Sequence, residues 1–212
     1  MDLIKKIILS RHGSTIYNDK ELLQGISDIP LSEKGIHESE LLAEHLKTEK
    51  IEKIYHTPLI RTKQTAEFVN KYHNVQMECI DSFIEMDMGE WEGCIFPEFI
   101  KSHPDFYRQW VMDPHVGLPG GESFGTLYTR VNSGIQILLD PSYSSVLLVA
   151  HAMVNRAILG NFLHMNPLAA RHFRSGNCSI SRLSVYGTNG ESYVAVDTWN
   201  DTSHIKKAGK SV

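Results

Sequence analysis

Three short apolar runs along the chain are typical of buried β-strands. They cover residues 6–10, 54–56 and 145–150. The third run is continuously apolar from Val146 to Ala150, as expected of a strand that is covered on both faces. We therefore predict that these runs form the strands of a buried sheet.

Segments with helical features separate the apolar runs. Ser32 is the predicted N-cap of a helix that reaches about Lys47. A second helix is predicted to begin at Thr57, with Pro58 at its first helical position, and to extend toward Tyr72. Strands that alternate with helices predict an α/β fold of three layers, a mostly parallel sheet flanked by helices on both faces. In such sheets, ligands bind at the carboxyl ends of the strands.

Residues 88–125 interrupt this alternation, because prolines and aromatic side chains are scattered through them. We interpret the segment as a small helical/loop cap insertion within a single domain that spans residues 1–212. Most of its aromatic residues are expected to pack the cap against the core. In the last part of the chain, we predict strands at residues 181–185 and 193–196 with a turn at 187–190 between them. Residues 205–212 are predicted to form a frayed tail.

The charge balance and the cysteines exclude some classes of partner and site. A formal net charge of −4 gives no overall attraction to nucleic acid or to an anionic membrane. No apolar stretch approaches the roughly 20 residues that span a bilayer, and no signal peptide is visible. Cys79, Cys94 and Cys178 are odd in number and far apart, which indicates reduced thiols and a cytoplasmic location. No spacing of Cys, His and Asp suggests a metal site.

Arg11-His12-Gly13 follows the first predicted strand and suits phosphate chemistry. A neutral imidazole, with an unperturbed pKa of about 6.5, is a competent nucleophile near pH 7. The planar guanidinium beside it fits phosphate oxygens better than an ammonium does. On its own the tripeptide is a weak signal, because a histidine at the end of a strand is more often structural.

The segments around this tripeptide carry a family resemblance that continues nearly to the C-terminus. The stretch from Leu9 to Asn18, followed by residues 23–25 and 28–35, resembles the histidine phosphatase superfamily, also called the phosphoglycerate mutase-like family. Further similar segments lie at residues 56–67, 83–93, 119–123 and 149–156. The resemblance implies that His12 accepts a phosphoryl group on an imidazole nitrogen and then passes it to water.

The resemblance also implies a set of groups around the phosphate. Arg61 is the second cation beside Arg11, and His151 faces His12 across the phosphate, where it donates to an oxygen when protonated. Such groups stabilise charge on the equatorial oxygens of the transferring group. Two histidines at the ends of different parallel strands are expected to converge on one site.

Glu85 matches the position of the family's proton donor to the leaving oxygen. A carboxyl group used in this way needs a raised pKa, from burial or from nearby negative charge. Asp87, Glu90 and Glu92 are close in sequence and are the rival candidates. The glycine-x-tryptophan-glutamate-glycine pattern that follows Glu85 favours Glu85.

Neutral donors complete the phosphate site implied by the resemblance. Asn18, the backbone around Gly25 and Ile26, and the amide of Ala152 are the expected groups. Ala152 stands where the family more often has glycine, so that a methyl group is added near the phosphate. The aromatic residues Tyr17, Trp91 and Trp110 are candidate specificity contacts.

These features favour a metal-independent phosphomonoesterase without a cofactor, which acts on small phosphorylated metabolites through a phosphohistidine intermediate. Family precedent permits a monomer or a homodimer. A cofactor-dependent phosphoglycerate mutase is the alternative. Ser14 weakens it, because mutases usually carry glutamate there, and so does the cap, because mutases have an arginine-rich substrate segment where this chain has the solitary Arg108. A third interpretation is a catalytically idle module that binds phosphorylated ligands, although no reactive residue is missing. Sugar phosphates, phosphoglycerates, nucleotide-precursor phosphates and phosphoserine all stay open as substrates.

Overall fold

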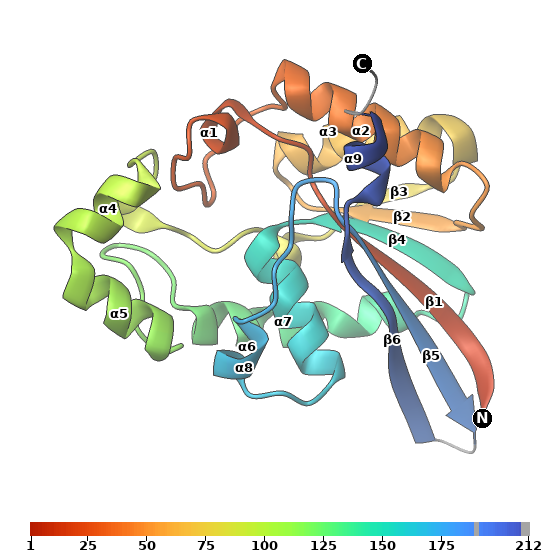
Figure 1. Ribbon diagram of the computed structural model, residues 1–212. Helices are drawn as coiled ribbons and strands as arrows, with labels where there is room; N and C mark the ends of the chain where they lie inside the picture. Colours follow the sequence, from red (N-terminus) through yellow and green to blue (C-terminus); the bar gives the residue numbers. More distant parts are fainter. Residues whose placement is uncertain (189–190, 209–212) are drawn as a thin grey trace.

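The computed structural model describes residues 1–188 and 191–208 and contains a six-stranded sheet with strand order β3-β2-β4-β1-β5-β6 (Figure 1). Strands β1 to β4 pair in parallel, and β5 and β6 extend the sheet in antiparallel pairs. The prediction of a mostly parallel sheet is therefore confirmed. The strands are β1 (Asp2–Arg11), β2 (Lys53–His56), β3 (Met77–Cys79), β4 (Ser145–Ala150), β5 (Ile180–Thr188) and β6 (Glu191–Asp201).

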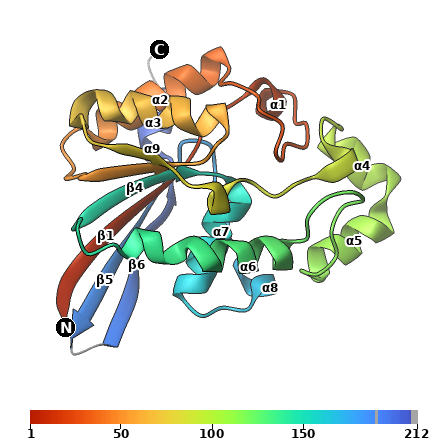
Figure 2. The same ribbon diagram turned by 180° about the vertical axis from the view of Figure 1, so that it is seen from behind.

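Helices cover both faces of the sheet. One face carries α2 (Glu33–Leu46), α3 (Ile60–His73) and α9 (Ser203–Ala208), and the other carries α6 (Phe124–Gly134), α7 (Ala152–Phe162) and α8 (Pro167–Ala170). The view from behind shows the same two helical layers (Figure 2). The remaining helices are α1 (Ile16–Asp19), α4 (Phe96–Ser102), α5 (Pro104–Met112) and the 3₁₀ turns η1 (Asp81–Phe83), η2 (Gly89–Trp91) and η3 (Ile135–Leu139). The predicted three-layer arrangement is thus confirmed.

Two hydrophobic clusters fill the spaces between the layers. Leu147 and Val149 of β4 belong to the cluster under α2 and α3, whereas Leu148 and Val146 belong to the cluster under α6 and α7. All four side chains are fully buried. Successive side chains of a strand point to opposite faces, so a continuously apolar strand supplies both clusters.

The predicted start of α2 agrees with the structure, whereas the predicted start of α3 does not. Ser32 caps α2 as predicted, because its hydroxyl accepts a hydrogen bond from the Gly35 amide at 3.2 Å. The predicted start of α3 at Thr57 is wrong: the helix begins at Ile60 with Leu59 at the N-cap. The Thr57 hydroxyl is instead 2.9 Å from the Thr62 hydroxyl and is turned into the protein interior.

The end of the chain also differs from the prediction. Residues 205–208, expected to belong to a frayed tail, lie in α9, and residues 209–212 are outside the described part. The late strands are longer than expected, and part of the turn predicted at 187–190 falls outside the described residues. In the part of the chain that the structure covers, no helix has both the length and the apolar character needed to cross a bilayer.

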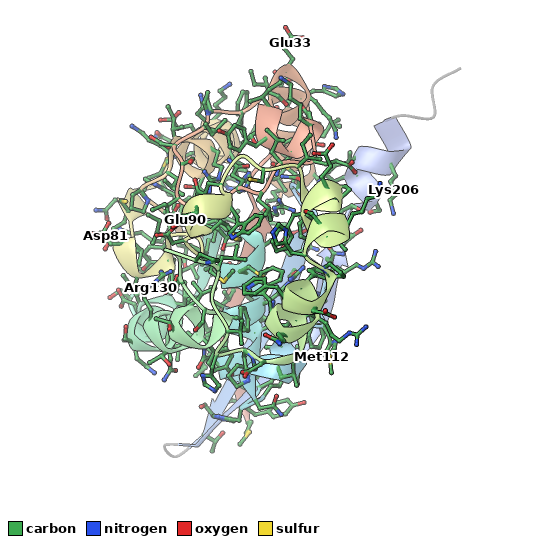
Figure 3. The ribbon with its side chains drawn as sticks, turned by 90° about the vertical axis from the view of Figure 1, so that its left-hand side faces the viewer. Glu33, Asp81, Glu90, Met112, Arg130 and Lys206 are labelled. Carbon is green, nitrogen blue, oxygen red and sulfur yellow. The ribbon has the colours of Figure 1, made fainter. Side chains whose placement is uncertain are left out.

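Helices α4 and α5 stand apart from the sheet, on the left in Figure 1. Their aromatic residues pack against one another: the Phe96 and Tyr107 rings are 6.0 Å apart, and the Tyr107 and Trp110 rings are 6.1 Å apart. This pair of helices faces the viewer in Figure 3, with Met112 near its lower end. It lies on the side toward which the parallel strands run, so the cavity between it and the sheet edge is where a ligand is expected.

Candidate active site

The two histidines singled out in the sequence lie side by side. Arg11 at the end of β1 pairs in register with Ala150 at the end of β4, and the His12 amide donates to the Ala150 carbonyl at 3.1 Å. The residue that follows the end of each strand is a histidine, His12 after β1 and His151 after β4. The ring centroids of His12 and His151 are 5.3 Å apart. The expected convergence follows from the register of two parallel strands.

His12 is held in the tautomer that a nucleophile requires. Its Nδ1 is 2.7 Å from the Gly13 carbonyl oxygen, which can only accept a hydrogen bond, so Nδ1 carries the proton. The lone pair is thereby left on Nε2. Burial, with the nearby charges of Arg61 and Arg11, holds the pKa of His12 well below its usual value, so the ring is neutral.

His151 is fully buried and bound on one side only. Its Nε2 is 2.8 Å from the Thr57 hydroxyl, and its Nδ1 has no partner among the described residues. Burial and the charges of Arg61, His12 and Arg11 hold the pKa of His151 well below the ordinary value. A bound phosphate would oppose this shift, because an adjacent anion favours the protonated ring.

Two arginines, Arg61 fully buried and Arg11 partly buried, supply fixed positive charge. Arg61, the second residue of α3, is completely buried, and its two terminal nitrogens donate to the carbonyls of Ser27 at 2.7 Å and Gly25 at 2.6 Å. Burial lowers its pKa to about 10. Arg11 donates from Nη1 to the Ser175 carbonyl at 3.0 Å. The Nε of each arginine is buried without a partner in the described chain, which leaves donors for an anion.

The surroundings of Glu85 shift its pKa in the direction that a proton donor needs. Only 5% of the residue is exposed, and burial raises its pKa, although the amides of Met86 and Met153 and the charges of Arg61 and Arg11 oppose the shift. The Met86 amide donates to Oε1 at 2.9 Å and the Met153 amide to Oε2 at 3.3 Å.

Arg130 of α6 positions the segment that carries Glu85. Its Nη1 donates to the carbonyls of Ser82 at 2.8 Å and Ile84 at 3.0 Å, while its Nη2 is 2.8 Å from a carboxylate oxygen of Glu122. In Figure 3 the Arg130 label lies below that of Glu90, on the same side of the molecule. Local sequence gives no sign of this support, because residues 82–85 and 122–130 meet only in the folded chain.

The rival acids have other surroundings. Asp87 accepts a hydrogen bond from the Gly89 amide at 2.8 Å, and Glu90 is exposed. Glu92 accepts hydrogen bonds from the amides of Ile26 and Ser27, the latter at 2.9 Å. Glu92 therefore holds the loop around Gly25 in place.

The Gly25 loop differs from the expectation in one respect. The Ile26 amide, predicted to bind phosphate, donates to Glu92, so a phosphate contact there would have to displace this carboxylate. Gly25 itself is pressed against the chain: a Cβ at this position would lie 2.5 Å from the Met86 carbonyl oxygen and 2.7 Å from the Met88 amide nitrogen. Only glycine allows that approach.

Asn18 lies at the site. Its Oδ1 is occupied, because it accepts hydrogen bonds from the Thr15 amide at 3.2 Å and from Asn177 Nδ2 at 3.1 Å. Asn177 also donates to the His12 carbonyl at 3.0 Å. The sequence reasoning missed Asn177, which reaches the site only because β5 begins beside the end of β1.

A cavity of about 400 Å³ opens above these groups. Trp110 lies on its wall, whereas Tyr17 and Trp91 are not among the lining residues. Trp91 packs edge-on against Phe99 and His103, with ring centroids 4.5 and 4.4 Å away. The lining residues are Arg11, His12, Asn18, Glu21, Leu22, Leu23, Gln24, Glu85, Met88, Phe96, Pro97, Trp110, Ala152, Met153 and Asn177.

His12, Arg11 and Glu85 line one cavity, and His151 and Arg61 are buried close to His12 without lining that cavity themselves. This set of groups suits phosphate chemistry. The model of the histidine phosphatase superfamily (branch 1) matches residues 7–202. The chain belongs to the histidine phosphatase superfamily. It is accordingly an enzyme of the phosphatase class, as the sequence indicated.

Similar members of the superfamily carry different names. Phosphoserine phosphatase 1 of Hydrogenobacter thermophilus is 33% identical over 178 residues, which are 83% of this chain and 84% of that protein. Probable phosphoglycerate mutase GpmB of Salmonella choleraesuis is 32% identical over 203 residues, 94% of each chain.

Solved structures show the same fold. A mycobacterial glucosyl-3-phosphoglycerate phosphatase superposes with a TM-score of 0.85 at 24% identity, covering 93% of this chain and 100% of that one. YhfR of Bacillus stearothermophilus superposes with a TM-score of 0.82 at 27% identity, covering 95% and 99%. The histidine phosphatase fold therefore extends over nearly the whole chain.

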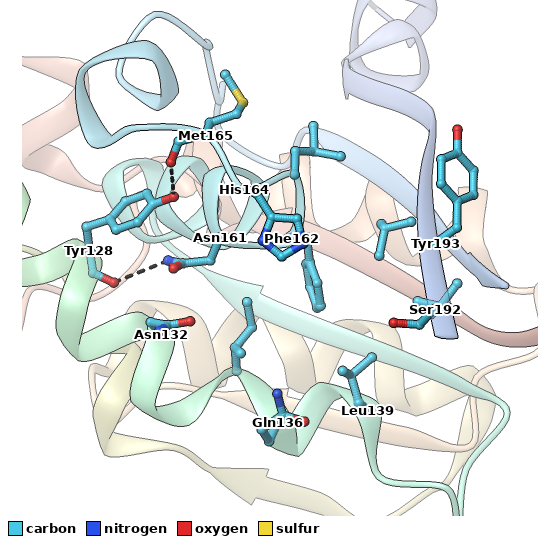
Figure 4. A pocket seen from close by; sticks show the side chains of 14 residues that line it. Tyr128, Asn132, Gln136, Leu139, Asn161, Phe162, His164, Met165, Ser192 and Tyr193 are labelled. Carbon is cyan, nitrogen blue, oxygen red and sulfur yellow. Dashed lines mark hydrogen bonds between the residues drawn. The ribbon is translucent and has the colours of Figure 1, made fainter. Parts of the chain in front are cut away.

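A second, larger cavity of this histidine phosphatase lies elsewhere (Figure 4). It measures about 770 Å³ and lies between α6, η3, the end of α7 and the β5–β6 hairpin. Tyr128 donates to the Met165 carbonyl at 2.6 Å across one side, and Asn161 donates to the Tyr128 carbonyl at 3.2 Å. Among the residues that the structure describes, those lining it include no arginine, lysine or carboxylate, whereas Arg11, His12 and Glu85 line the smaller cavity.

Proposed function

We propose that this chain is a metal-independent phosphomonoesterase that hydrolyses small phosphorylated metabolites through a phosphohistidine on Nε2 of His12. The observation that carries the proposal is the tautomer of His12. Its Nδ1–H is bound to the Gly13 carbonyl, so the Nε2 lone pair is the available nucleophile on a cavity wall that also bears Arg11 and Glu85.

In the first step, Nε2 of His12 attacks phosphorus and the bond to the ester oxygen breaks. Glu85 gives its proton to the departing oxygen, so the alcohol leaves neutral and Glu85 becomes a carboxylate. In the second step, that carboxylate takes a proton from water, the resulting hydroxyl attacks phosphorus, and the bond to Nε2 breaks. Inorganic phosphate leaves, and both groups return to their starting states.

Five groups are proposed to stabilise the transferring phosphoryl group. Arg11 and Arg61 supply guanidinium charge, and His151, protonated once the dianion is present, donates a hydrogen bond to one of its oxygens. Asn18 Nδ2 and the Ala152 amide at the start of α7 add neutral donors. These groups are fixed by the fold before substrate binds, so little reorganisation is needed in the transition state.

The finer expectations from the sequence belong to the same proposal. A cavity of about 400 Å³ suits a metabolite rather than a macromolecule. We take residues 88–125 as a cap within one domain that spans residues 1–212, and a cytoplasmic monomer or homodimer as the working form.

Phosphoglycerate mutase activity is the second candidate, since one relative carries that name at 32% identity. A mutase would keep the phosphohistidine and pass the group to a substrate hydroxyl instead of water. Against it, Arg11 is the one arginine among the described residues that line the cavity, and no described lysine lines it. Isomer formation from 3-phosphoglycerate, exceeding phosphate release, would favour the mutase.

The test is phosphate release from a panel of phosphomonoesters with excess chelator. We expect chelator-resistant turnover that His12→Ala abolishes, because the nucleophile is lost, while the exposed control His37→Ala keeps it. Brief incubation with radiolabelled substrate should trap an acid-labile adduct on the wild-type protein. Turnover that survives in purified His12→Ala would contradict the assignment.

A further inference from the structure

A group of arginines without carboxylate partners lies near the catalytic cavity. Arg156 is on α7, and Arg171 and Arg174 follow α8. Within residues 1–188 and 191–208, none of the three forms an ion pair, whereas Arg130 and Arg182 each pair with a glutamate. Burial lowers the pKa of Arg156, and the charge of Arg174 adds to the effect. The region therefore carries positive charge that the protein itself leaves unpaired.

Arg171 has an evident structural role, and Arg174 is exposed. Arg171 donates from Nη1 to the Trp110 carbonyl, and its guanidinium carbon lies 4.6 Å from the centroid of the Trp110 ring. Arg171 thereby connects α5, which contains Trp110, to the loop after α8. Arg174 is exposed to solvent.

Arg156 is neither exposed nor well bound. Its Nε is buried without a partner, and its one hydrogen bond among the described residues runs from Nη1 to the thioether sulfur of Met153 at 3.2 Å. A thioether is a weak acceptor. A partly buried guanidinium held only by sulfur is a costly arrangement, and a carboxylate could displace the sulfur with a gain in hydrogen bonding.

The position of Arg156 relates it to the reacting atoms. Met153 lines the catalytic cavity, and its amide donates to Glu85 Oε2 at 3.3 Å. Arg156 lies on the same helix face, about 4.5 Å further along the axis. Glu85 is near enough for its charge to raise the pKa of Arg156 in opposition to burial. The residue whose sulfur holds Arg156 is thus the residue whose amide holds Glu85.

We propose that Arg156 binds a carboxylate of the substrate, and that the preferred substrates are small phosphomonoesters with a carboxylate a few bonds from the ester oxygen. Phosphorylated hydroxy acids and amino acids meet this description. The inference rests on the proposed function, in which Arg11 and Arg61 are used by the phosphate. Arg156 is then left for a second anionic group of the same molecule.

The test compares two esters that differ only in the carboxylate, O-phosphoserine and O-phosphoethanolamine. We expect the wild-type protein to favour phosphoserine at least tenfold in kcat/KM, as for a charge-assisted hydrogen bond. Arg156→Met should remove most of that preference, chiefly by raising the KM for phosphoserine. Arg108→Met, which alters an exposed arginine of α5, should keep it.

The outcomes separate this inference from the proposed function. The role of Arg156 would be overturned if the wild-type protein showed no preference, or if Arg156→Met lost activity equally on both esters. In either case, His12-dependent hydrolysis of p-nitrophenyl phosphate would still support the phosphatase. Loss of that hydrolysis as well would overturn both. If Arg156→Met does not fold, Arg156→Lys serves instead: a point charge without the planar fork should give an intermediate preference, and an unchanged preference would count against the proposal.

Discussion

At the scale of single residues, the site holds titratable groups whose surroundings move their pKa values apart. Burial and two arginines lower the pKa of His12, which keeps the nucleophile neutral. Burial raises the pKa of Glu85 despite the same two arginines, which favours the protonated form of the proposed acid. Opposite shifts from one buried environment suit the nucleophile and the acid of the proposed two-step displacement.

The role of Glu85 predicts a dependence on the leaving group. Glu85→Gln cannot donate a proton, so kcat/KM for an alkyl phosphate should fall by about 10² to 10⁴. The loss should be much smaller for p-nitrophenyl phosphate, whose phenolate leaves without protonation. Steady-state rates on the two esters measure the difference.

A matched variant checks the choice among the nearby carboxylates. Glu90→Gln alters an exposed side chain two residues before Glu92 and should leave both rates near those of the wild type. An equal loss on the two esters in Glu85→Gln would assign Glu85 to packing or binding rather than to proton transfer.

At the scale of elements, the connection from β2 to α3 positions the second histidine. Thr57 lies after β2, where its hydroxyl binds Nε2 of His151 at 2.8 Å and the Thr62 hydroxyl at 2.9 Å. The helix starts later than its sequence predicts because this hydroxyl is used inside the protein and does not cap the helix. Because α3 begins at Ile60, Arg61 lies in its first turn.

Thr57→Val should weaken both activity and stability. The change keeps the shape of the side chain but leaves His151 Nε2 buried without a partner, which costs about 1 to 3 kcal/mol of the free energy of unfolding. We expect kcat/KM to fall because the ring is no longer held, and urea denaturation with a kinetic assay measures both effects.

Thr57→Ser is the informative control, since serine keeps the hydroxyl and lacks only the methyl group. It should behave like the wild type. A loss in Thr57→Ser as large as that in Thr57→Val would show that the methyl group, and not the hydrogen bond, matters at this position.

At the scale of the whole molecule, the active site depends on one central strand. β4 lies between β2 and β1, and its side chains enter the clusters on both faces of the sheet. His151 directly follows this strand, so the packing of both helical layers determines where the histidine stands.

Leu148→Ala should therefore destabilise the fold strongly. Leu148 is fully buried, and truncation of a buried leucine leaves a cavity that costs about 2 to 5 kcal/mol. Leu3→Ala on β1, where 47% of the residue is exposed, should change the free energy of unfolding by less than about 0.5 kcal/mol. Similar losses for the two variants in urea denaturation would contradict this account of the core.

The sequence by itself determined what depends on local pattern. Apolar runs located the strands β1, β2 and β4, Ser32 located the start of α2, and the motifs around His12, Arg61 and His151 identified groups that the structure brings together. These features are readable because a strand period, a cap or a motif is complete within a few residues.

Only the tertiary structure decided how distant segments use the same residues. Glu92, a rival acid in the sequence, proved to hold the Gly25 loop, and Thr57 proved to bind His151 instead of capping a helix. Asn177 reaches the site through a neighbour far away in the chain, and Arg156 is related to Glu85 only by the fold. Burial and hydrogen-bond partners arise from the packing of segments that are remote in sequence, so no local pattern carries them.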